Sequence, residues 1–328
     1  MDELDRQLLN LLQTEFPIVP QPFQALAQRL GISEDEVLMR VRTLKDNRII
    51  RQISAIFDSS SLGYKSALAA FSVPTERVTE VAEIVSAHPG VSHNYERNHV
   101  YNLWFTITVP PGTTPETEVD RLAAQVNPLA ARVFPTVRLF KIGVAFDMTG
   151  KDEAGAAMVS AVNVGSKPVE LNEEDKKAVR ALQRDLPIER RPFATLASTI
   201  GLREEDIIAK ARVFLEVGAM RRYAAVLRHR EAGFTANAMA AWNVPDELVE
   251  QTGLKLAAHP SISHCYQRPT YPDWPYSVFT MIHGRTPEDC EKIARELSEA
   301  TGITDYVLLY STREFKKTRV QYYEHTER

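Results

Sequence analysis

The chain has 328 residues, of which 44% are hydrophobic and 25% charged, and its formal net charge is −4. A chain of this length buries more than one core, so we expect a globular protein with two or more domains. No apolar run is long enough to span a bilayer, and Met1 leads directly into an acidic helix, so we expect neither a membrane span nor a signal peptide. The negative charge argues against nucleic acid as a partner, because DNA affinity depends on Lys and Arg that neutralise phosphates.

Cysteine usage and the common sequence motifs exclude further classes of protein. Cys265 and Cys290 form neither a metal-ligand spacing nor a disulfide framework, which is typical of a protein of the reducing cytoplasm. The sequence contains no P-loop, no GxGxxG, no HExxH and no CxxC motif. Nucleotide hydrolysis, dinucleotide binding and a structural zinc site therefore have no support.

The chain contains an internal duplication. Phe16-Pro17-Ile18 and Leu186-Pro187-Ile188 lie 170 positions apart, as do Gly31 and Gly201. After one inserted residue the correspondence continues in the pairs His88-Pro89 with His259-Pro260, and Ser92-His93 with Ser263-His264. We therefore interpret the chain as two copies of one module.

The start of each copy predicts three short helices. In the first copy leucines at helical spacing favour a helix over residues 2–13, and a second helix over 23–30 should end at Gly31. Ser33 should cap the third helix and form a capping box with Glu36. Residues 49–57 would then form the wing of a winged helix-turn-helix, and residues 171–229 repeat the pattern.

From Ser66 the pattern changes to alternating strands and helices. In the first copy we expect strands and helices in the order β-α-β-β-α-β over residues 67–73, 76–87, 91–97, 103–109, 116–126 and 133–146. In the second copy the strands fall near residues 235–243, 262–268, 276–283 and 304–316. This order is the ferredoxin-like arrangement, an antiparallel sheet with both helices on one face.

The sequence thus predicts an α+β protein of two tandem modules, each a winged helix-turn-helix followed by a ferredoxin-like βαββαβ domain. The predicted helix-turn-helix units span residues 1–60 and 169–230, and the ferredoxin-like domains span 61–149 and 231–328. A linker rich in Gly, Ala and Ser joins the halves over residues 150–168.

The helix-turn-helix units are poorly suited to reading DNA. The recognition helices would begin with Ser33-Glu34-Asp35-Glu36 and Arg203-Glu204-Glu205-Asp206, and phosphates would repel these acids. Basic residues do follow in the first copy, at Arg40, Arg42 and Lys45. We favour a structural or dimerising role for these units over DNA binding.

Each copy carries a polar stretch at the end of its second predicted strand. Residues two apart in a strand share a side, so His93, Tyr95 and Arg97 project together, and His264, Tyr266 and Arg268 repeat this set. One interpretation is a hydrogen-bonded network that holds the β-hairpin. The other is a pocket wall, because imidazole can ligate iron or donate a proton and guanidinium pairs with carboxylates.

Basic residues near the predicted wings could add contacts to carboxylates. They are Arg51 in the first copy and Arg221-Arg222-Tyr223 in the second. The alternative is an ordinary solvated wing, and for Arg51 alone this is the simpler interpretation.

The order of elements resembles the leucine-responsive (Lrp/AsnC) regulators, and the polar stretches resemble a narrower branch, the two subunits of sirohaem decarboxylase. The resemblance covers nearly the whole chain apart from the linker, and this sequence looks like a fusion of both subunits. Four segments carry it: His93-Asn94-Tyr95-Glu96-Arg97 with Tyr101-Asn102-Leu103-Trp104-Phe105, Tyr266-Gln267-Arg268-Pro269-Thr270-Tyr271-Pro272-Asp273-Trp274-Pro275, Arg138-Leu139-Phe140-Lys141-Ile142-Gly143-Val144, and Tyr310-Ser311-Thr312-Arg313-Glu314-Phe315-Lys316-Lys317.

The resemblance implies a carboxy-lyase that removes two acetate carboxylates from sirohaem and gives didecarboxysirohaem, a step of haem or haem d1 biosynthesis. It implies no cofactor beyond the iron of the tetrapyrrole substrate, and a pseudo-dimer within one chain that could form a homodimer. The arginines and histidines of the polar stretches suit this reaction, since sirohaem carries many carboxylates and loss of CO2 leaves a carbanion that needs a proton.

On this hypothesis His93 and His264 are proton donors or ligands of the substrate iron, with His99 as a rival in the first copy. Tyr95 and Tyr266 would orient the acid. The expected substrate contacts are Arg97, Arg268, Arg51, Arg221, Arg222, Tyr223, Trp104, Trp274, Tyr101 and Tyr271.

The alternative function is a transcription regulator of the Lrp/AsnC type in which a small ligand, such as haem, binds the same stretches. The second copy has no counterpart of His99 and carries a Pro-rich insertion. One half could therefore be catalytic and the other supportive, and the sequence leaves open which is which.

Overall fold

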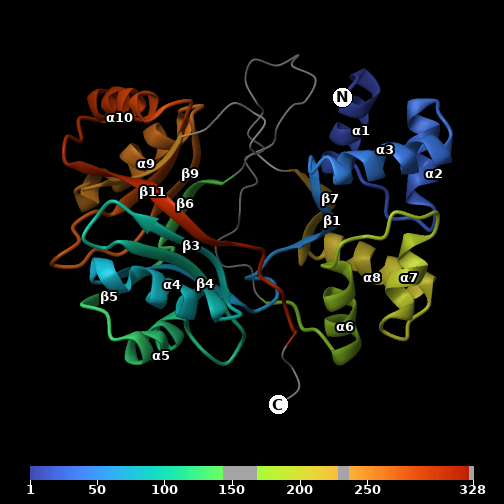
Figure 1. Ribbon diagram of the computed structural model, residues 1–328, viewed down its shortest axis with the longest axis horizontal. Coiled ribbons are helices and arrows are strands. Elements are labelled where there is room, and N and C mark those ends of the chain that lie inside the picture. Colours follow the sequence, from blue (N-terminus) through green and yellow to red (C-terminus); the bar gives the residue numbers. More distant parts are fainter. Residues whose placement is uncertain (143–167, 228–235, 325–328) are drawn as a thin grey trace.

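The computed structural model describes residues 1–142, 168–227 and 236–324. Figure 1 shows two parts, with the helix-turn-helix units of both copies on the right and the larger sheet with its helices on the left. Each copy therefore contributes to both parts, and the α+β class with two tandem modules is confirmed. Apart from Pro168, the predicted linker lies outside the described residues.

The first helix-turn-helix consists of α1 (Glu3–Thr14), α2 (Pro22–Leu30) and α3 (Glu34–Asp46). Gly31 ends α2 in the left-handed conformation with φ 69°, as predicted. Ser33 caps α3 by accepting a hydrogen bond from the backbone of Glu36 at 3.2 Å. The Glu36 carboxylate accepts from Arg40 at 3.0 Å, so only half of the predicted capping box forms.

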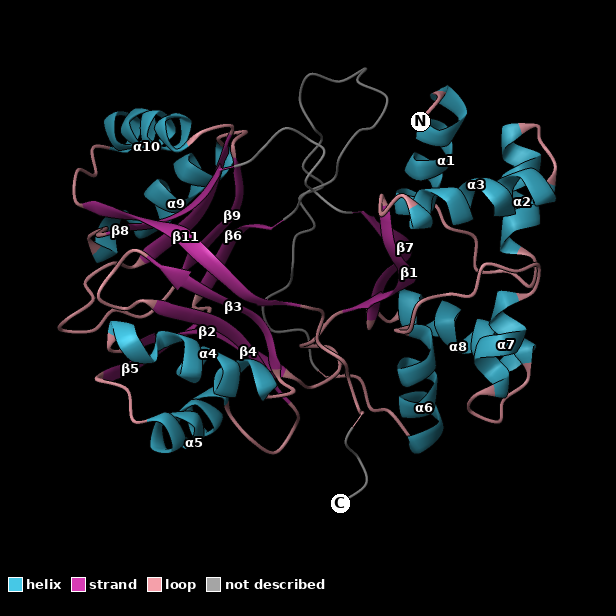
Figure 2. Cartoon of the chain, viewed as in Figure 1, coloured by secondary structure: helices cyan, strands magenta, loops and turns pink. Residues whose placement is uncertain are grey.

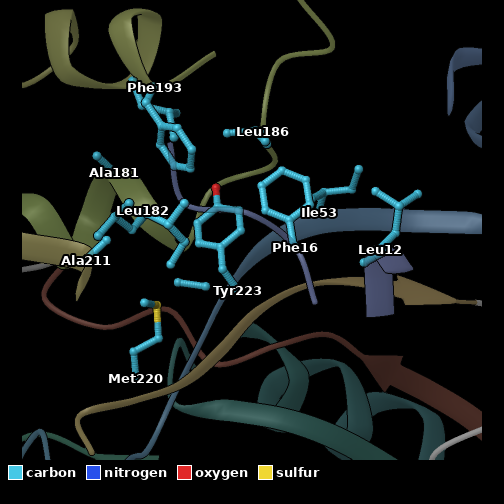
Figure 3. Close-up of a cluster of buried hydrophobic side chains, with 14 of the residues drawn as sticks. Leu12, Phe16, Ile53, Ala181, Leu182, Leu186, Phe193, Ala211, Met220 and Tyr223 are labelled. Atoms are coloured by element: carbon cyan, nitrogen blue, oxygen red, sulfur yellow. The ribbon is translucent and has the colours of Figure 1, made fainter. Parts of the chain in front are cut away.

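The second helix-turn-helix repeats this arrangement with α6 (Glu173–Leu182), α7 (Pro192–Ser198) and α8 (Glu204–Glu216). Both units share one hydrophobic core, which Figure 3 shows around the ring of Tyr223. Side chains of the first copy, Leu12 and Phe16, lie there beside Leu182 and Phe193 of the second. The helix-turn-helix units are therefore packed as a pair.

The segment predicted as the wing, residues 49–57, forms a strand, but that strand does not form a hairpin within its own copy. β1 (Ile50–Phe57) does not fold back on its own copy but pairs antiparallel with β7 (Met220–Leu227) of the other copy. A single strand leaves its backbone groups unpaired, and the equivalent strand of the other half supplies the missing partners. Figure 2 shows the resulting two-stranded ribbon between the helix-turn-helix pair and the large sheet.

The first ferredoxin-like unit follows the predicted order. Its strands lie in the spatial order β5-β2-β4-β3, and a short 3-10 turn, Thr75–Arg77, precedes its first helix. The elements are β2 (Lys65–Ser72), α4 (Val78–Ala87), β3 (Val91–Arg97), β4 (Leu103–Val109), α5 (Pro115–Val126) and β5 (Ala130–Pro135).

The second unit has the equivalent order β11-β8-β10-β9, with a 3-10 turn at Asp246–Leu248. Its elements are β8 (Ala236–Trp242), α9 (Val249–Ala258), β9 (Ile262–Gln267), β10 (Val278–Gly284), α10 (Pro287–Thr301) and β11 (Tyr306–Lys317).

The two units exchange strands. The predicted continuous strand over residues 133–146 is wrong, because it breaks after Pro135 and resumes as β6 (Arg138–Ile142), which pairs with β9 of the second unit. In return, the C-terminal part of β11 pairs with β3 of the first unit. Pro135 has no N–H to extend the ladder with β2, so the chain changes partner at this point.

The faces of the sheet opposite the helices share a core. Trp104 and Phe134 of the first unit pack there with Met239 and Phe279 of the second. The helices α4 and α5 cover the outer face of one unit, and α9 and α10 that of the other (Figure 1). Among the described residues, none of the helices is both long and apolar enough to cross a bilayer.

Candidate functional site

His93 and His264 occupy equivalent positions on β3 and β9, each beside an exchanged strand. His93 lies opposite Lys317 of β11, and His264 lies opposite Ile142 of β6. Each ring makes a hydrogen bond through Nδ1 to the preceding serine, at 3.0 Å from Ser92 and 2.7 Å from Ser263. The side chains of both histidines are half-buried.

Each histidine stacks on the tyrosine two residues further along its strand. The ring centroids are 6.2 Å apart for His93 and Tyr95, and 6.1 Å apart for His264 and Tyr266. The predicted common side of His, Tyr and Arg is thus present in both halves, since Arg97 lies over the Tyr95 ring at 5.7 Å and Arg268 over Tyr266 at 4.8 Å.

The fold brings the two histidines into electrostatic reach of one another. Burial, together with the nearby His283, Arg268 and His93, lowers the pKa of His264 to about 4. Burial also lowers the pKa of His93, with Lys317 and Arg51 acting in the same direction. Both imidazoles are therefore neutral near pH 7, with a lone pair on one nitrogen and a proton on the other.

The tyrosine hydroxyls are held protonated. Burial, together with Glu314, its cross-strand neighbour on β11, raises the pKa of Tyr95 to about 12. Burial also raises the pKa of Tyr266, against the opposing effect of Arg268 and Arg221. Each hydroxyl is therefore a hydrogen-bond donor beside its histidine.

The guanidinium groups of Arg97 and Arg268 are buried and bond to backbone carbonyls of the protein, whereas a carboxylate contact at the surface was expected. Arg97 donates from Nη1 to the carbonyl of Leu309 at 2.7 Å, and Arg268 donates from Nη1 to the carbonyl of Phe134. Burial lowers the pKa of both guanidinium groups to about 10. Each retains a buried Nε without a hydrogen-bond partner among the described residues, so both remain cations with unused donors.

A group of basic side chains surrounds these strands, contributed by the two-stranded ribbon and the segment after β11. Burial, together with the nearby Arg51 and Arg222, lowers the pKa of Arg319 to about 10. Arg51 also donates to the carbonyl of Lys317 at 3.1 Å. Like charges lower one another's pKa only when they lie close together, so the fold concentrates positive charge here.

We call this set the histidine–arginine cluster: His93, His264, Arg51, Arg222 and Arg319. Glu314 brings a negative charge to it and raises the pKa of His93. Arg319, Lys317 and Glu314 were not among the residues predicted for the site. For Lys317 and Arg319 the signal was the run Lys316-Lys317-Thr318-Arg319, which the first copy does not repeat.

Two of the predicted substrate contacts on β7 are engaged elsewhere. Arg221 pairs with Asp58, with 3.0 Å between Nε and Oδ2. Tyr223 is buried in the core of the helix-turn-helix pair, where Figure 3 shows its ring among apolar side chains. Burial raises the pKa of Tyr223 well above its ordinary value, and Tyr223 is therefore not a candidate for substrate contact.

The aromatic residues expected to line a pocket form the core between the two units instead. Trp104 and Trp274 are both fully buried, and their rings lie 5.2 Å apart. Tyr101 donates to Asp273 at 2.5 Å, and Tyr271 donates to the carbonyl of Val133 at 2.5 Å. These residues pack between the strands that carry the site.

His99 packs against the aromatic side chains of this core between the two units. Its Nδ1 accepts a hydrogen bond from the backbone of Tyr101 at 3.1 Å, and its ring packs edge-to-face with Trp274 of the other copy, with 5.2 Å between the ring centroids. Burial lowers its pKa. His93 and His264 are therefore the better candidates for chemistry. Within the described ranges no three His, Cys, Asp or Glu side chains converge as a metal site.

Comparison with known families first defines the class of protein. A model of the AsnC-like ligand binding domain matches residues 61–141 and 231–316. A model of the siroheme decarboxylase NirDL-like helix-turn-helix domain matches residues 5–51 and 175–221. The chain is thus a tandem pair of AsnC-like modules.

Individual relatives narrow this class. A siroheme decarboxylase of Hydrogenobacter thermophilus is 41% identical over 98% of this chain and 95% of its own. The beta subunit of the Methanosarcina barkeri siroheme decarboxylase is 49% identical over 46% of this chain and 99% of its own. A crystal structure of the siroheme decarboxylase NirDL in co-complex with an iron-uroporphyrin III analogue is 36% identical, covers 98% of this chain and 94% of its own, and has a TM-score of 0.78. The chain belongs to the sirohaem decarboxylase family.

Proposed function

We propose that this protein is a carboxy-lyase that removes CO2 from two acetate side chains of sirohaem and yields didecarboxysirohaem. The histidine–arginine cluster carries the proposal, because it combines concentrated positive charge with two neutral imidazoles. The family supports it, since a full-length relative of the same two-module length is a siroheme decarboxylase. The product would enter haem or haem d1 biosynthesis.

The arginines would hold the carboxylates that are not lost. Arg51, Arg222 and Arg319 each lie near other cations, so binding of an anionic substrate would relieve their mutual repulsion. The guanidinium groups of Arg97 and Arg268 are more deeply buried, and their Nε groups, which have no partner among the described residues, would add positive charge and hydrogen-bond donors to the site. Arginine suits this task because its planar fork pairs with carboxylate in a bidentate manner.

The histidines would supply the proton or bind the substrate iron. Decarboxylation breaks the bond between the acetate methylene and its carboxylate, and the remaining electron pair must take up a proton. A neutral imidazole can donate the proton on one ring nitrogen, and the lone pair of the other histidine could face the iron. Tyr95 and Tyr266, which keep their protons, would orient the two rings.

Substrate binding would also change the protonation of the histidines. The carboxylates would bring negative charge to a site where neighbouring cations lower the pKa of His93 and His264. The pKa of both groups would therefore rise on binding. No cofactor beyond the substrate iron is part of this proposal, and the exchanged strands make the chain a pseudo-dimer whether or not it also forms a homodimer.

The regulator alternative receives less support, because several basic residues of the helix-turn-helix units contact the opposite unit. Arg42 of α3 donates to the carbonyl of Ile188 at 2.7 Å, and Arg212 of α8 donates to that of Ile18 at 3.0 Å. Further pairs of the same kind are Lys45 with Asp185 and Arg190 with Asp35. A DNA phosphate would have to displace these contacts, so we propose a structural role for the pair.

Anaerobic incubation of the purified protein with sirohaem, followed by mass spectrometry of the tetrapyrrole, tests the proposal. Two successive losses of CO2 support it. An unchanged tetrapyrrole, together with tight and salt-dependent binding to a DNA duplex, would favour the regulator. Protein without substrate and substrate without protein are the controls.

A further inference from the structure

A chain of hydrogen bonds leads from His264 to the protein surface. Nδ1 of His264 bonds to Oγ of Ser263 at 2.7 Å, and the same Oγ lies 2.5 Å from Nε2 of His283. The other ring nitrogen of His283, Nδ1, lies 2.5 Å from Oδ1 of Asn237. Ser263 is buried, His283 is half-buried and Asn237 is exposed, so the chain connects the site with solvent.

The first half does not repeat this chain. His283 and Asn237 form a cross-strand pair between β10 and β8, and the equivalent pair between β4 and β2 is Thr108 and Ser66. The hydroxyls of Thr108 and Ser66 bond to each other at 2.7 Å. Within the described residues, no hydrogen bond joins this pair to the Ser92 hydroxyl beside His93. A threonine hydroxyl also carries no ionisable proton near neutral pH, unlike imidazole.

We propose that Ser263 and His283 form a proton relay that supplies His264, so that the second half of the chain carries the acid of the reaction. The inference rests on the proposed sirohaem decarboxylase function and assigns roles to Ser263 and His283, which do not touch the substrate. His93 would then serve the substrate in another way, through its iron or its carboxylates.

Each decarboxylation consumes one proton. The bond between the acetate methylene and the carboxylate breaks, CO2 leaves, and the electron pair stays on the methylene carbon. His264 gives its Nε2 proton to that carbon, which becomes a methyl group. Nδ1 of His264 takes the hydroxyl proton of Ser263, and the Ser263 oxygen takes the Nε2 proton of a protonated His283. One proton from solvent for each CO2 released then reprotonates His283, and His264, left with its proton on Nδ1, regains the Nε2–H form by proton exchange before the next turnover.

A relay lets His264 donate a proton although its own imidazolium form is disfavoured. Its surroundings keep it neutral, since burial and three nearby basic side chains lower its pKa to about 4. A charged imidazolium at this position would therefore be scarce near pH 7. With the relay, the positive charge rests on His283, which is nearer to solvent, and His264 passes a proton on without carrying a net charge. Asn237 accepts from Nδ1 of His283 and leaves Nε2 directed at Ser263.

The test compares His283→Thr, which introduces the residue that the first half uses, with Thr108→Val as the matched control in β4. We expect His283→Thr to lower kcat by about 100-fold, at the lower end of the range for loss of proton transfer, and to leave the sirohaem Kd within about twofold of wild type. Added imidazole should restore part of the lost rate. Thr108→Val should keep the wild-type kcat. A second variant, His283→Gln, keeps polar groups at this position but cannot pass on a net proton, and should behave as His283→Thr does.

The outcomes separate the relay from the function on which it rests. If wild type releases CO2 and both His283 variants keep its kcat, the relay is overturned and the decarboxylase function stands. If the variants lose sirohaem affinity and imidazole restores nothing, His283 is structural and the relay is overturned as well. If wild type leaves sirohaem unchanged, the proposed function itself fails.

Discussion

The two halves of the chain have the same fold but differ in the side chains around His93 and His264. His93 lies beside the charged end of β11, where Lys317 and Glu314 act on its pKa. His264 lies beside the shorter β6, and its serine leads on to His283. The duplication thus preserved the strands and the His–Tyr–Arg set, while the side chains next to them diverged. One half is better equipped to hold an anion, and the other to deliver a proton.

The halves also differ where the exchanged strands meet the helices. Phe315 of β11 packs in the core that contains α4, and Phe140 of β6 packs in the core that contains α9. The position facing Phe140 is Gly253, and its counterpart in α4 is the buried Ala82. In the second half the glycine therefore leaves room for the Phe140 ring beside the helix backbone, where a Cβ would meet it.

The largest expected effect distinguishes the two histidines. We expect His264→Ala to lower turnover of sirohaem by about 10²–10³-fold, because general acid catalysis contributes on that order. His93→Ala should cost less, and its effect should include a weaker Kd. His99→Ala, which removes a packing contact, should lower the melting temperature more than turnover. Mass spectrometry of the product over time measures all three. Equal, wild-type turnover for every variant would show that the assignment is wrong.

The next effect concerns pH and stability. The pKa of His264 in the folded protein, about 4, lies below the ordinary value of 6.5, so the unfolded state binds the proton more tightly. Stability is therefore fully present above pH 6.5 and is lost as the pH falls towards 4. At 1.4 kcal/mol per pKa unit, the loss amounts to about 3 kcal/mol.

Urea unfolding of the ligand-free protein at several pH values between 7 and 4.5 measures this loss. His264→Gln should flatten the dependence over that interval, since glutamine does not titrate. Identical slopes for wild type and variant would mean that His264 contributes nothing to acid sensitivity.

The difference at the helix joint predicts a smaller effect. A Cβ added at Gly253 would lie 2.4 Å from ring atoms of Phe140, so the ring or the helix must move. We expect Gly253→Ala to destabilise the protein by about 1–3 kcal/mol, as overpacking does. The double variant Gly253→Ala with Phe140→Leu should recover part of this loss, because the ring is gone. The reverse change in the first half, Ala82→Gly, should cost only about 1 kcal/mol of helix propensity. A Gly253→Ala protein as stable as wild type by urea unfolding would contradict the close packing.

The smallest expected effect tests the basic cluster. Arg319→Gln should raise KM for sirohaem about tenfold with little change in kcat, which corresponds to about 1.4 kcal/mol of binding. The matched control is Arg203→Gln, because Arg203 is exposed at the N-cap of α8 and already paired with Asp206. Steady-state kinetics at fixed ionic strength separates the two. A tenfold change in the control, or none in Arg319→Gln, would remove Arg319 from the substrate site.

The sequence by itself determined the local elements and their duplication. β3 and β4 begin and end at the predicted residues, 91–97 and 103–109, because the pattern of apolar and polar side chains along a short segment is a property of neighbouring residues. Gly31 and Ser33 likewise ended and began helices through their own backbone and hydroxyl chemistry. The His–Tyr–Arg sets were visible for the same reason, since a strand places every second residue on one side.

Only the tertiary structure decided which strands pair and which polar residues meet. The partner of β1 is β7, and that of β6 is β9, although nothing near either strand in the sequence indicates it. Strand exchange then buried Trp104 and Trp274 in the shared core and placed Arg319 beside Arg51. Backbone hydrogen bonding is the same for every sequence, so the choice of partner depends on how the whole apolar surface is buried.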